Sequence, residues 1–370
     1  MNNHSEHNLQ SNKEALDAGR RQLLKLTGTG IAAACVTSAI ATPAVAETTL
    51  KLEGSWDKIF AKSEKVEHKK VTFSNRYGIT LAADLYQPKN ASGKLPALAV
   101  SGPFGAVKEQ SSGLYAQTMA ERGFITLAFD PSYTGESGGE PRNIASPDIN
   151  TEDFSAAVDF LGLLPAVDRE RIGIIGICGW GGMALNAAAV DKRIKAVVAS
   201  TMYDMSRVMS KGYNDSTTKE QRTAALEQLS QQRWKDIAAG KPALGPVSLE
   251  LKGGEPQFVQ EYAGYYKSTK RGFHPRAINS NSAWALTNPL SFMNMPLLSY
   301  IDEISPRPLL LIHGEKAHSR YFSETAYKAA AEPKELLIIK GANHVDLYDQ
   351  MDVIPFDKLI EFFRNSLLKA

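Results

Sequence analysis

The chain has 370 residues, 43% of them hydrophobic, and its 42 Lys and Arg residues nearly balance 40 Asp and Glu residues. This composition suits a folded globular protein and argues against intrinsic disorder. No long block of like charges occurs, so we expect a small-molecule substrate and no nucleic acid. The 7 histidines are scattered, with no His-Glu-x-x-His or paired Cys-x-x-Cys spacing, so no metal or organic cofactor is implied.

The N-terminal segment has the three parts of an export signal. Arg20 and Arg21 begin a basic region, small apolar residues follow over Leu26–Ala41, and a small-x-small site ends at Ala46. This order is typical of a cleaved signal peptide, and the arginine pair indicates the twin-arginine type. A retained anchor is the alternative, but the stretch is shorter than the roughly 20 apolar residues of a membrane span.

We therefore expect the twin-arginine export machinery to deliver a periplasmic or secreted protein, residues 47–370, without stable membrane insertion after cleavage of residues 1–46. Lipid attachment through Cys35 is a further alternative, but the alanines before it lack the usual aliphatic residue. Cleavage removes Cys35 and leaves Cys178 as the only cysteine. A lone thiol is a liability in an oxidising compartment, so Cys178 either has a chemical role or packs as a small hydrophobe.

The first predicted elements are two strands joined by a tight turn. Val66–Phe73 and Ile79–Tyr86 alternate in polarity around Asn75–Gly78, which predicts a hairpin. Continuous apolar runs follow, as expected for parallel strands buried on both faces. They are Ala97–Ser101, Ile125–Asp130, Ile172–Ile177, Ala196–Ser200, Leu309–His313 and Leu337–Ile339.

Helical patterns fill the gaps between these runs. They are Gly113–Arg122, Thr151–Leu164, Gly182–Val190, Ser323–Ala331 and Phe356–Leu368. The alternation predicts an α/β fold with a doubly wound, mostly parallel sheet. Residues of about 202–300 interrupt the alternation of strands and helices with an aromatic-rich, helical sequence. We interpret this segment as a cap inserted between strands 6 and 7, over the carboxyl edge of the sheet where ligands bind in such folds.

One stretch of the sequence contains the candidate nucleophile. The strand Ile172–Ile177 leads into Cys178-Gly179-Trp180-Gly181-Gly182 and then a helix. This is the context of a nucleophile elbow, in which a strained turn projects a reactive side chain from the sheet. The amide of Gly179 begins the helix, where it can donate to an oxyanion and lower the pKa of a thiol. A phosphate-binding turn is the alternative, but no Gly-Lys-Ser/Thr completes it.

Four segments together resemble the α/β-hydrolase superfamily, especially its dienelactone-hydrolase-like and X-prolyl-peptidase-like (cocaine-esterase-like) branches. These segments, each following a predicted strand, are Pro103–Gln110, Phe129–Arg142, the Cys178 turn and Gly341–Tyr348. The resemblance implies the fold of that superfamily, Cys178 as the nucleophile and His344 as the base. It also implies a second oxyanion amide near Phe104 or Gly105.

The sequence departs from the family pattern at two positions. Trp180 stands where the elbow pattern has glycine, so we expect it to occupy a roomier turn or to shape the pocket. An aspartate is expected a few residues beyond Gly314, but Ala317 and His318 stand there. Glu315 is the nearest carboxylate and our candidate acid, with Asp204 after the sixth strand as the alternative.

These residues predict a hydrolase that cleaves an ester, lactone or related acyl bond through an acyl-cysteine intermediate. The alternatives are acyl transfer or peptide-like cleavage in the same site, and a non-catalytic ligand-binding relative that has lost the acid.

Export is directly testable. The mature protein should begin near Glu47, and a fusion should reach the periplasm only when Arg20 and Arg21 are intact. N-terminal sequencing of periplasmic protein from wild type and from Arg20→Lys with Arg21→Lys checks both points. Full-length chain in the soluble periplasm would contradict cleavage, and export of the double variant would contradict the twin-arginine route.

Overall fold

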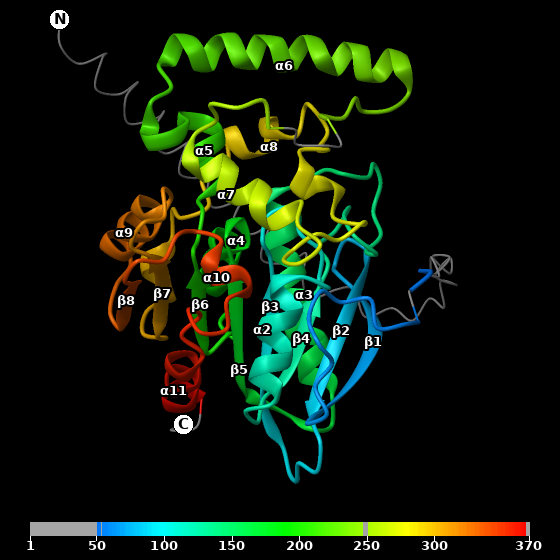
Figure 1. Ribbon diagram of the computed structural model, residues 1–370, viewed down its shortest axis with the longest axis vertical. Coiled ribbons are helices and arrows are strands. Elements are labelled where there is room, and N and C mark those ends of the chain that lie inside the picture. The colour runs from blue at the N-terminus through cyan, green and yellow to red at the C-terminus, as the bar shows by residue number, and fades with distance from the viewer. Residues whose placement is uncertain (1–49, 53, 247–250, 368–370) are drawn as a thin grey trace, which may run out of the picture. The chain divides into compact units, whose positions relative to one another are not determined.

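The computed structural model describes residues 50–52, 54–246 and 251–367, and the predicted signal peptide with Cys35 lies outside them. In the described chain, eight strands form one sheet in the order β1-β2-β4-β3-β5-β6-β7-β8 (Figure 1). Strand β2 pairs antiparallel with β1 and β4, and the remaining neighbours are parallel. The strands are β1 (Val66–Ser74), β2 (Thr80–Pro88), β3 (Leu95–Ser101), β4 (Ile125–Phe129), β5 (Val167–Ile177), β6 (Ala196–Ser200), β7 (Leu309–Gly314) and β8 (Lys334–Ile339).

Helices cover both faces of this sheet. One face packs against α3 (Pro147–Leu163), α4 (Gly179–Val190) and α9 (Arg320–Ala329). The other packs against α2 (Ser111–Ala120), the short α10 (Asp346–Asp349) and α11 (Phe356–Leu367). The predicted doubly wound, mostly parallel α/β sheet is confirmed.

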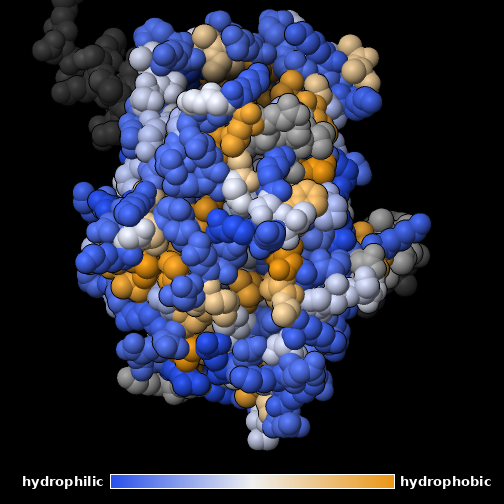
Figure 2. All heavy atoms as spheres, viewed as in Figure 1, coloured by the Kyte–Doolittle hydropathy of each residue, from blue (hydrophilic) through white to orange (hydrophobic). Residues whose placement is uncertain are grey.

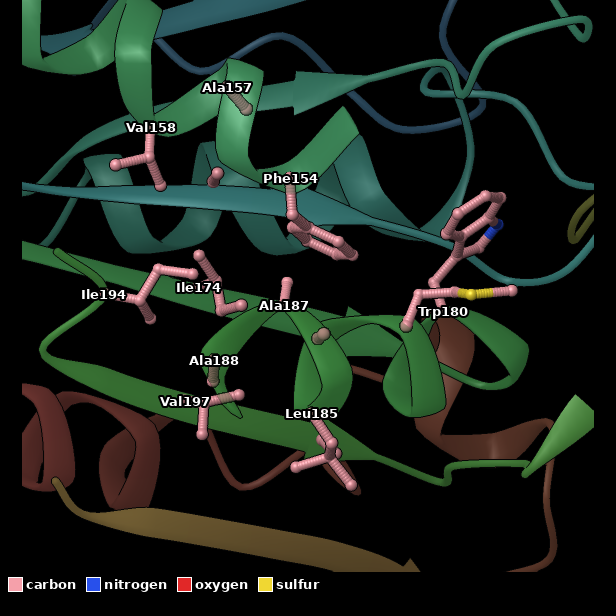
Figure 3. Packing of buried hydrophobic residues seen from close by; sticks show 14 of the residues in the cluster. Phe154, Ala157, Val158, Ile174, Trp180, Leu185, Ala187, Ala188, Ile194 and Val197 are labelled. Atoms are coloured by element: carbon pink, nitrogen blue, oxygen red, sulfur yellow. The ribbon is translucent and has the colours of Figure 1, made fainter. Parts of the chain in front are cut away.

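Strand alternation explains the two cores. Ile174 of β5 belongs to the cluster with α3 and α4, whereas its neighbour Ile175 belongs to the cluster with α2 and α11. Figure 3 shows Phe154 of α3 and Ala187 of α4 packed close together beside β5. Because both faces are covered, β3, β4, β6, β7 and the second half of β5 are built from mostly apolar, buried runs.

The inserted segment between β6 and β7 is helical, as predicted, and its helices gather at one end of the sheet (Figure 1). The helix α6 contains no buried residue, and its N-terminus has a reciprocal capping box between Thr218 and Gln221.

Hydrophilic residues predominate on the molecular face in Figure 2. Among the described residues, no helix is long and apolar enough to cross a membrane. The segment contains α5 (Met205–Lys211), η1 (Tyr213–Asp215), α6 (Lys219–Ala239), α7 (Gln257–Tyr266), η2 (Ile278–Asn281), α8 (Pro289–Met293) and η3 (Ile301–Ile304).

Glycine at the end of β5 permits the close packing of α4. A Cβ on Gly176 would lie 2.2 Å from the Trp180 carbonyl oxygen and 2.6 Å from the Ala184 Cβ. Gly176→Ala should therefore lower the free energy of unfolding by about 1–3 kcal/mol, the usual cost of overpacking a core. Urea unfolding measures the change.

Gly264→Ala in α7 is the matched control, because nothing lies within 4 Å of the added Cβ. Alanine should there stabilise the helix by up to about 1 kcal/mol. Equal free energies of unfolding for the two variants would contradict this account of the β5–α4 packing.

Candidate active site

The backbone of Cys178 is strained at the junction between β5 and α4. Its φ of 57° and ψ of −127° lie outside the regions that non-glycine residues usually adopt. The surrounding chain fixes this conformation, because the Cys178 amide donates to the Ser200 carbonyl at 2.9 Å and its carbonyl accepts from Tyr203 at 2.9 Å. The turn has the strained strand-to-helix conformation of a nucleophile elbow.

Two backbone amides converge on the Cys178 thiol. The amides of Phe104 and Gly179 both interact with it and favour its thiolate form. Gly179 is required for this approach, since a Cβ there would lie 2.7 Å from the Phe104 Cβ. Burial nevertheless dominates and raises the pKa of the thiol, so the expectation of a depressed thiol pKa was wrong.

Two of the predicted pocket residues have other positions. The backbone of Gly105 packs against the inserted segment, where a Cβ would lie 2.7 Å from the carbonyl carbon of Asn279. The amide near the thiol is that of Phe104, one residue earlier. Trp180 is buried in the core and stacks on the Phe104 ring with centroids 6.5 Å apart. The expectation that it shapes the cavity directly is therefore corrected.

A cavity of about 430 Å³ opens at Cys178. The inserted segment supplies most of its wall, and none of the described lining residues carries a charge. They are Phe104, Cys178, Tyr203, Met205, Val259, Tyr262, Tyr266, Asn279, Ser280, Ser282, Trp284 and Tyr348. A larger cavity of about 820 Å³ lies beside residues 50–52 and 135–142, but neither Cys178 nor a histidine lines it.

His344 is fully buried behind this cavity. Its Nδ1 lies 2.6 Å from the Ser319 hydroxyl and 2.9 Å from the Thr201 hydroxyl, and its Nε2 lies 2.9 Å from the Tyr348 hydroxyl. Burial lowers its pKa well below the ordinary value, so the imidazole is neutral at pH 7.

The hydrogen bonds at His344 continue through neutral groups. The Ser319 hydroxyl also lies 2.9 Å from Nε2 of His313, and Nδ1 of His313 lies 2.7 Å from the Ser323 hydroxyl. Burial lowers the pKa of His313 to about 3, so this ring is also uncharged at pH 7. Sequence reasoning missed Ser319, although it stands in the loop beyond Gly314 where the missing aspartate was expected.

Both candidate acids are directed elsewhere. The exposed Glu315 carboxylate accepts from the Gly341 amide at 2.9 Å, and Asp204 caps α5 by accepting from the Arg207 amide at 2.9 Å. In the described structure neither shares a hydrogen bond or ion pair with His344. The expected acid role of Glu315, and its alternative at Asp204, are therefore corrected: the sequence placed the right loop but the wrong side chain.

Charged groups are concentrated instead beneath the loop that carries Phe104. Lys108 is 1% exposed, and its ammonium lies 2.6 Å from Glu109 and 3.1 Å from Asp130. Arg276 of the inserted segment reaches the same Glu109 at 2.8 Å. These buried ion pairs tie the Phe104 loop to β4 and to the inserted segment, and so help to fix the position of the Phe104 amide.

The same network contains the carboxylates best placed for a metal ion, Asp57, Glu109 and Glu136, whose oxygens lie within 4.8 Å of one another. Protein cations already neutralise them. Lys70 contacts all three at 2.9–3.3 Å, and Arg276 contacts Asp57 at 2.6 Å. The donor set therefore fits an internal salt-bridge network.

Comparison with known proteins identifies the class. The family of X-Pro dipeptidyl-peptidases (S15 family) matches residues 77–270, and an uncharacterized Pseudomonas aeruginosa protein is 75% identical over 319 residues, 86% of each chain. The crystal structure of that protein matches with a TM-score of 0.85 and 74% identity, covering 86% of this chain and 99% of the other. The uncharacterized protein YcjY of Escherichia coli is 34% identical over 80% of this chain and 99% of its own.

A polyketide transferase, GrgF of a Penicillium species, is 29% identical over 75% of this chain and 89% of its own. The crystal structure of this α/β-hydrolase has a TM-score of 0.69 and 24% identity, covering 82% of this chain and 99% of the other, which supports the shared fold. Thiohydrolases are also among the relatives. The protein is thus a hydrolase with the α/β-hydrolase fold. The chain belongs to the X-Pro dipeptidyl-peptidase (S15) family.

The raised thiol pKa predicts the reactivity of Cys178. In the folded protein its alkylation by iodoacetamide should titrate above the ordinary thiol pKa of about 8.5, so that at pH 7 the thiolate fraction is smaller than in free cysteine. The rate of labelling measured between pH 6.5 and 10 gives the midpoint. The urea-unfolded chain is the control and should titrate near 8.5. A folded-state midpoint below that of the control would contradict the dominance of burial.

Proposed function

We propose that this protein breaks an acyl bond through a covalent intermediate on Cys178, with His344 as the general base. The convergence of the Phe104 and Gly179 amides on the thiol at the floor of a cavity carries the proposal. Such amides stabilise the negative charge that develops on the carbonyl oxygen of an attacked acyl group.

The surroundings of His344 favour a substrate with a good leaving group. In a triad, a carboxylate stabilises the imidazolium that later protonates the leaving atom. Here Ser319 and Thr201 supply only neutral hydroxyls to Nδ1. An amine must be protonated as it departs, whereas a thiolate can leave with little help. A thioester or an activated ester therefore fits this site better than a peptide.

The cavity favours a neutral acyl group. Its wall is rich in tyrosines and includes Trp284, with Asn279 and two serines for orientation, and lacks any charged residue among those described. An X-Pro peptide would bring a charged α-ammonium group for which this wall has no carboxylate. The names of the relatives GrgF, a polyketide transferase, and the thiohydrolases agree with an acyl substrate of this kind.

The reaction has two stages. The thiol loses its proton toward His344, Sγ bonds to the acyl carbon, and the leaving group takes that proton from His344 as it departs, which gives the acyl-Cys178 enzyme. Water then attacks the acyl carbon, its proton moves toward His344 and from there to Sγ, and the carboxylic acid leaves with the thiol restored. A second thiol or alcohol in place of water would make the same site an acyltransferase. We also propose that the twin-arginine machinery exports this enzyme.

A matched set of substrates tests this function. A benzoyl thioester, the p-nitrophenyl benzoate ester and Gly-Pro p-nitroanilide should be turned over in that order of kcat/KM. Cys178→Ala should lower thioester turnover by at least about 10³-fold, as expected when a nucleophile is removed. Acyl-enzyme trapped on Cys178 by mass spectrometry would identify the intermediate.

Two variants test whether Ser319 or Glu315 supports His344 during catalysis. Ser319→Ala should lower kcat by about 10-fold, because the His344 imidazole loses one of the hydrogen bonds that orient it. This loss is smaller than the roughly 10²–10⁴-fold that a general base contributes as a whole. Glu315→Gln is the control and should retain most activity, since its side-chain oxygen can still accept from Gly341. Full thioester activity in Cys178→Ala would refute the proposal, and a preference for the anilide would refute its substrate class.

A further inference from the structure

His344 does not reach the cavity that Cys178 lines. Cys178 and Tyr348 both line this cavity, whereas the buried His344 is not among its described lining residues. The rings of Tyr203, Tyr262 and Tyr348 each lie 5.3 Å from the His344 ring, edge-on, and enclose it. A proton moving between the cavity and His344 must therefore pass this shell of tyrosines.

Tyr348 is the member of the shell that bonds to the base. Its hydroxyl lies 2.9 Å from His344 Nε2, the nitrogen on the opposite side of the ring from Ser319 and Thr201. Tyr348 and Cys178 line the same cavity, and the Tyr348 hydroxyl favours the thiolate form of Cys178, which lowers the pKa of the thiol against the effect of burial. The phenol therefore lies between the cavity that holds the nucleophile and the His344 ring.

Local structure fixes this bridge. His344 and Tyr348 are four residues apart at the start of α10, and the Tyr348 amide donates to the Val345 carbonyl at 3.1 Å. The Tyr348 ring is buried against Tyr265, with centroids 5.0 Å apart and planes at 73°. The ring has little freedom to leave its place between the cavity and His344.

We propose that Tyr348 is a catalytic residue that relays the proton between Cys178 Sγ and His344 Nε2. As Sγ attacks the acyl carbon, the thiol proton passes to the Tyr348 oxygen while the phenol proton passes to Nε2. As the bond between Sγ and the acyl carbon forms, the electron pair of the carbonyl π bond moves to the acyl oxygen. The products of this step are a tetrahedral intermediate with a negatively charged oxygen, a neutral phenol and an imidazolium, so charge and protons balance. The reverse transfer returns the proton to the leaving group or to Sγ. The relay rests on the proposed function of Cys178.

Burial raises the pKa of Tyr348 well above its ordinary value and lowers that of His344 well below its own. A free phenolate is therefore too costly to be an intermediate, and the two protons move together. When two protons move in one step, the rate depends nonlinearly on the deuterium fraction of the solvent. A tyrosine with a purely structural role would not produce this dependence.

Tyr348→Phe removes the hydroxyl alone and is the test. Thioester kcat/KM should fall by at least about 10²-fold, within the range for general-base catalysis, and iodoacetamide labelling of Cys178 should slow. The wild-type rate should curve with deuterium fraction, and the residual rate of Tyr348→Phe should be linear. Tyr265→Phe is the matched control, since it is equally buried and packs on Tyr348, and it should keep the wild-type rate and curvature.

Thermal unfolding of both variants shows whether they fold. Wild-type turnover in a folded Tyr348→Phe, or a reduced rate that keeps the curved isotope dependence, would overturn the relay. If Cys178→Ala and His344→Ala are inactive in the same assay, the proposed function still stands when the relay fails. Activity in Cys178→Ala would remove the function itself and the relay with it.

Discussion

The left-handed backbone of Cys178 is the constraint on which the site depends. It turns the chain from strand β5 into α4 within one residue and places Cys178 in the wall of the cavity. The turn is tolerated because glycines surround it: Gly176 admits the first turn of α4, and Gly179 admits Phe104. The bonds to Ser200 and Tyr203 on the neighbouring strand end then hold the strained conformation in place.

Charged residues lie on one side of the Cys178 turn, and neutral residues lie on the other. On one side, Lys108, Glu109 and Asp130 form a buried ionic network under the Phe104 loop, where opposite charges satisfy one another. On the other side, His344 is held by hydroxyls and aromatic rings. The first arrangement helps to hold the loop in place, and the second leaves the His344 imidazole neutral.

The inserted segment connects the two sides. Arg276 joins the ionic network, while Tyr262 and Trp284 form part of the cavity wall. The walls of the cavity therefore depend on long-range contacts between the insertion and the sheet. Changes in the insertion would therefore alter the cavity wall while the turn at Cys178 stays the same.

Hydrophobic periodicity and glycine spacing are local signals, so the amino-acid sequence was enough to predict the chain order of strands and helices and the turn at Cys178. The resemblance to α/β-hydrolases then singled out His344 after the last strand. It also indicated that the usual aspartate is absent. The groups that contact His344 in place of an aspartate could not be predicted in this way. Thr201, Ser319 and Tyr348 come from three separate segments and meet at His344 only when the sheet is assembled. Glu315 lies in the same loop as Ser319, yet its carboxylate accepts a hydrogen bond from the Gly341 amide. Proximity along the chain does not fix side-chain direction, and the packing of β7, β8 and α10 does.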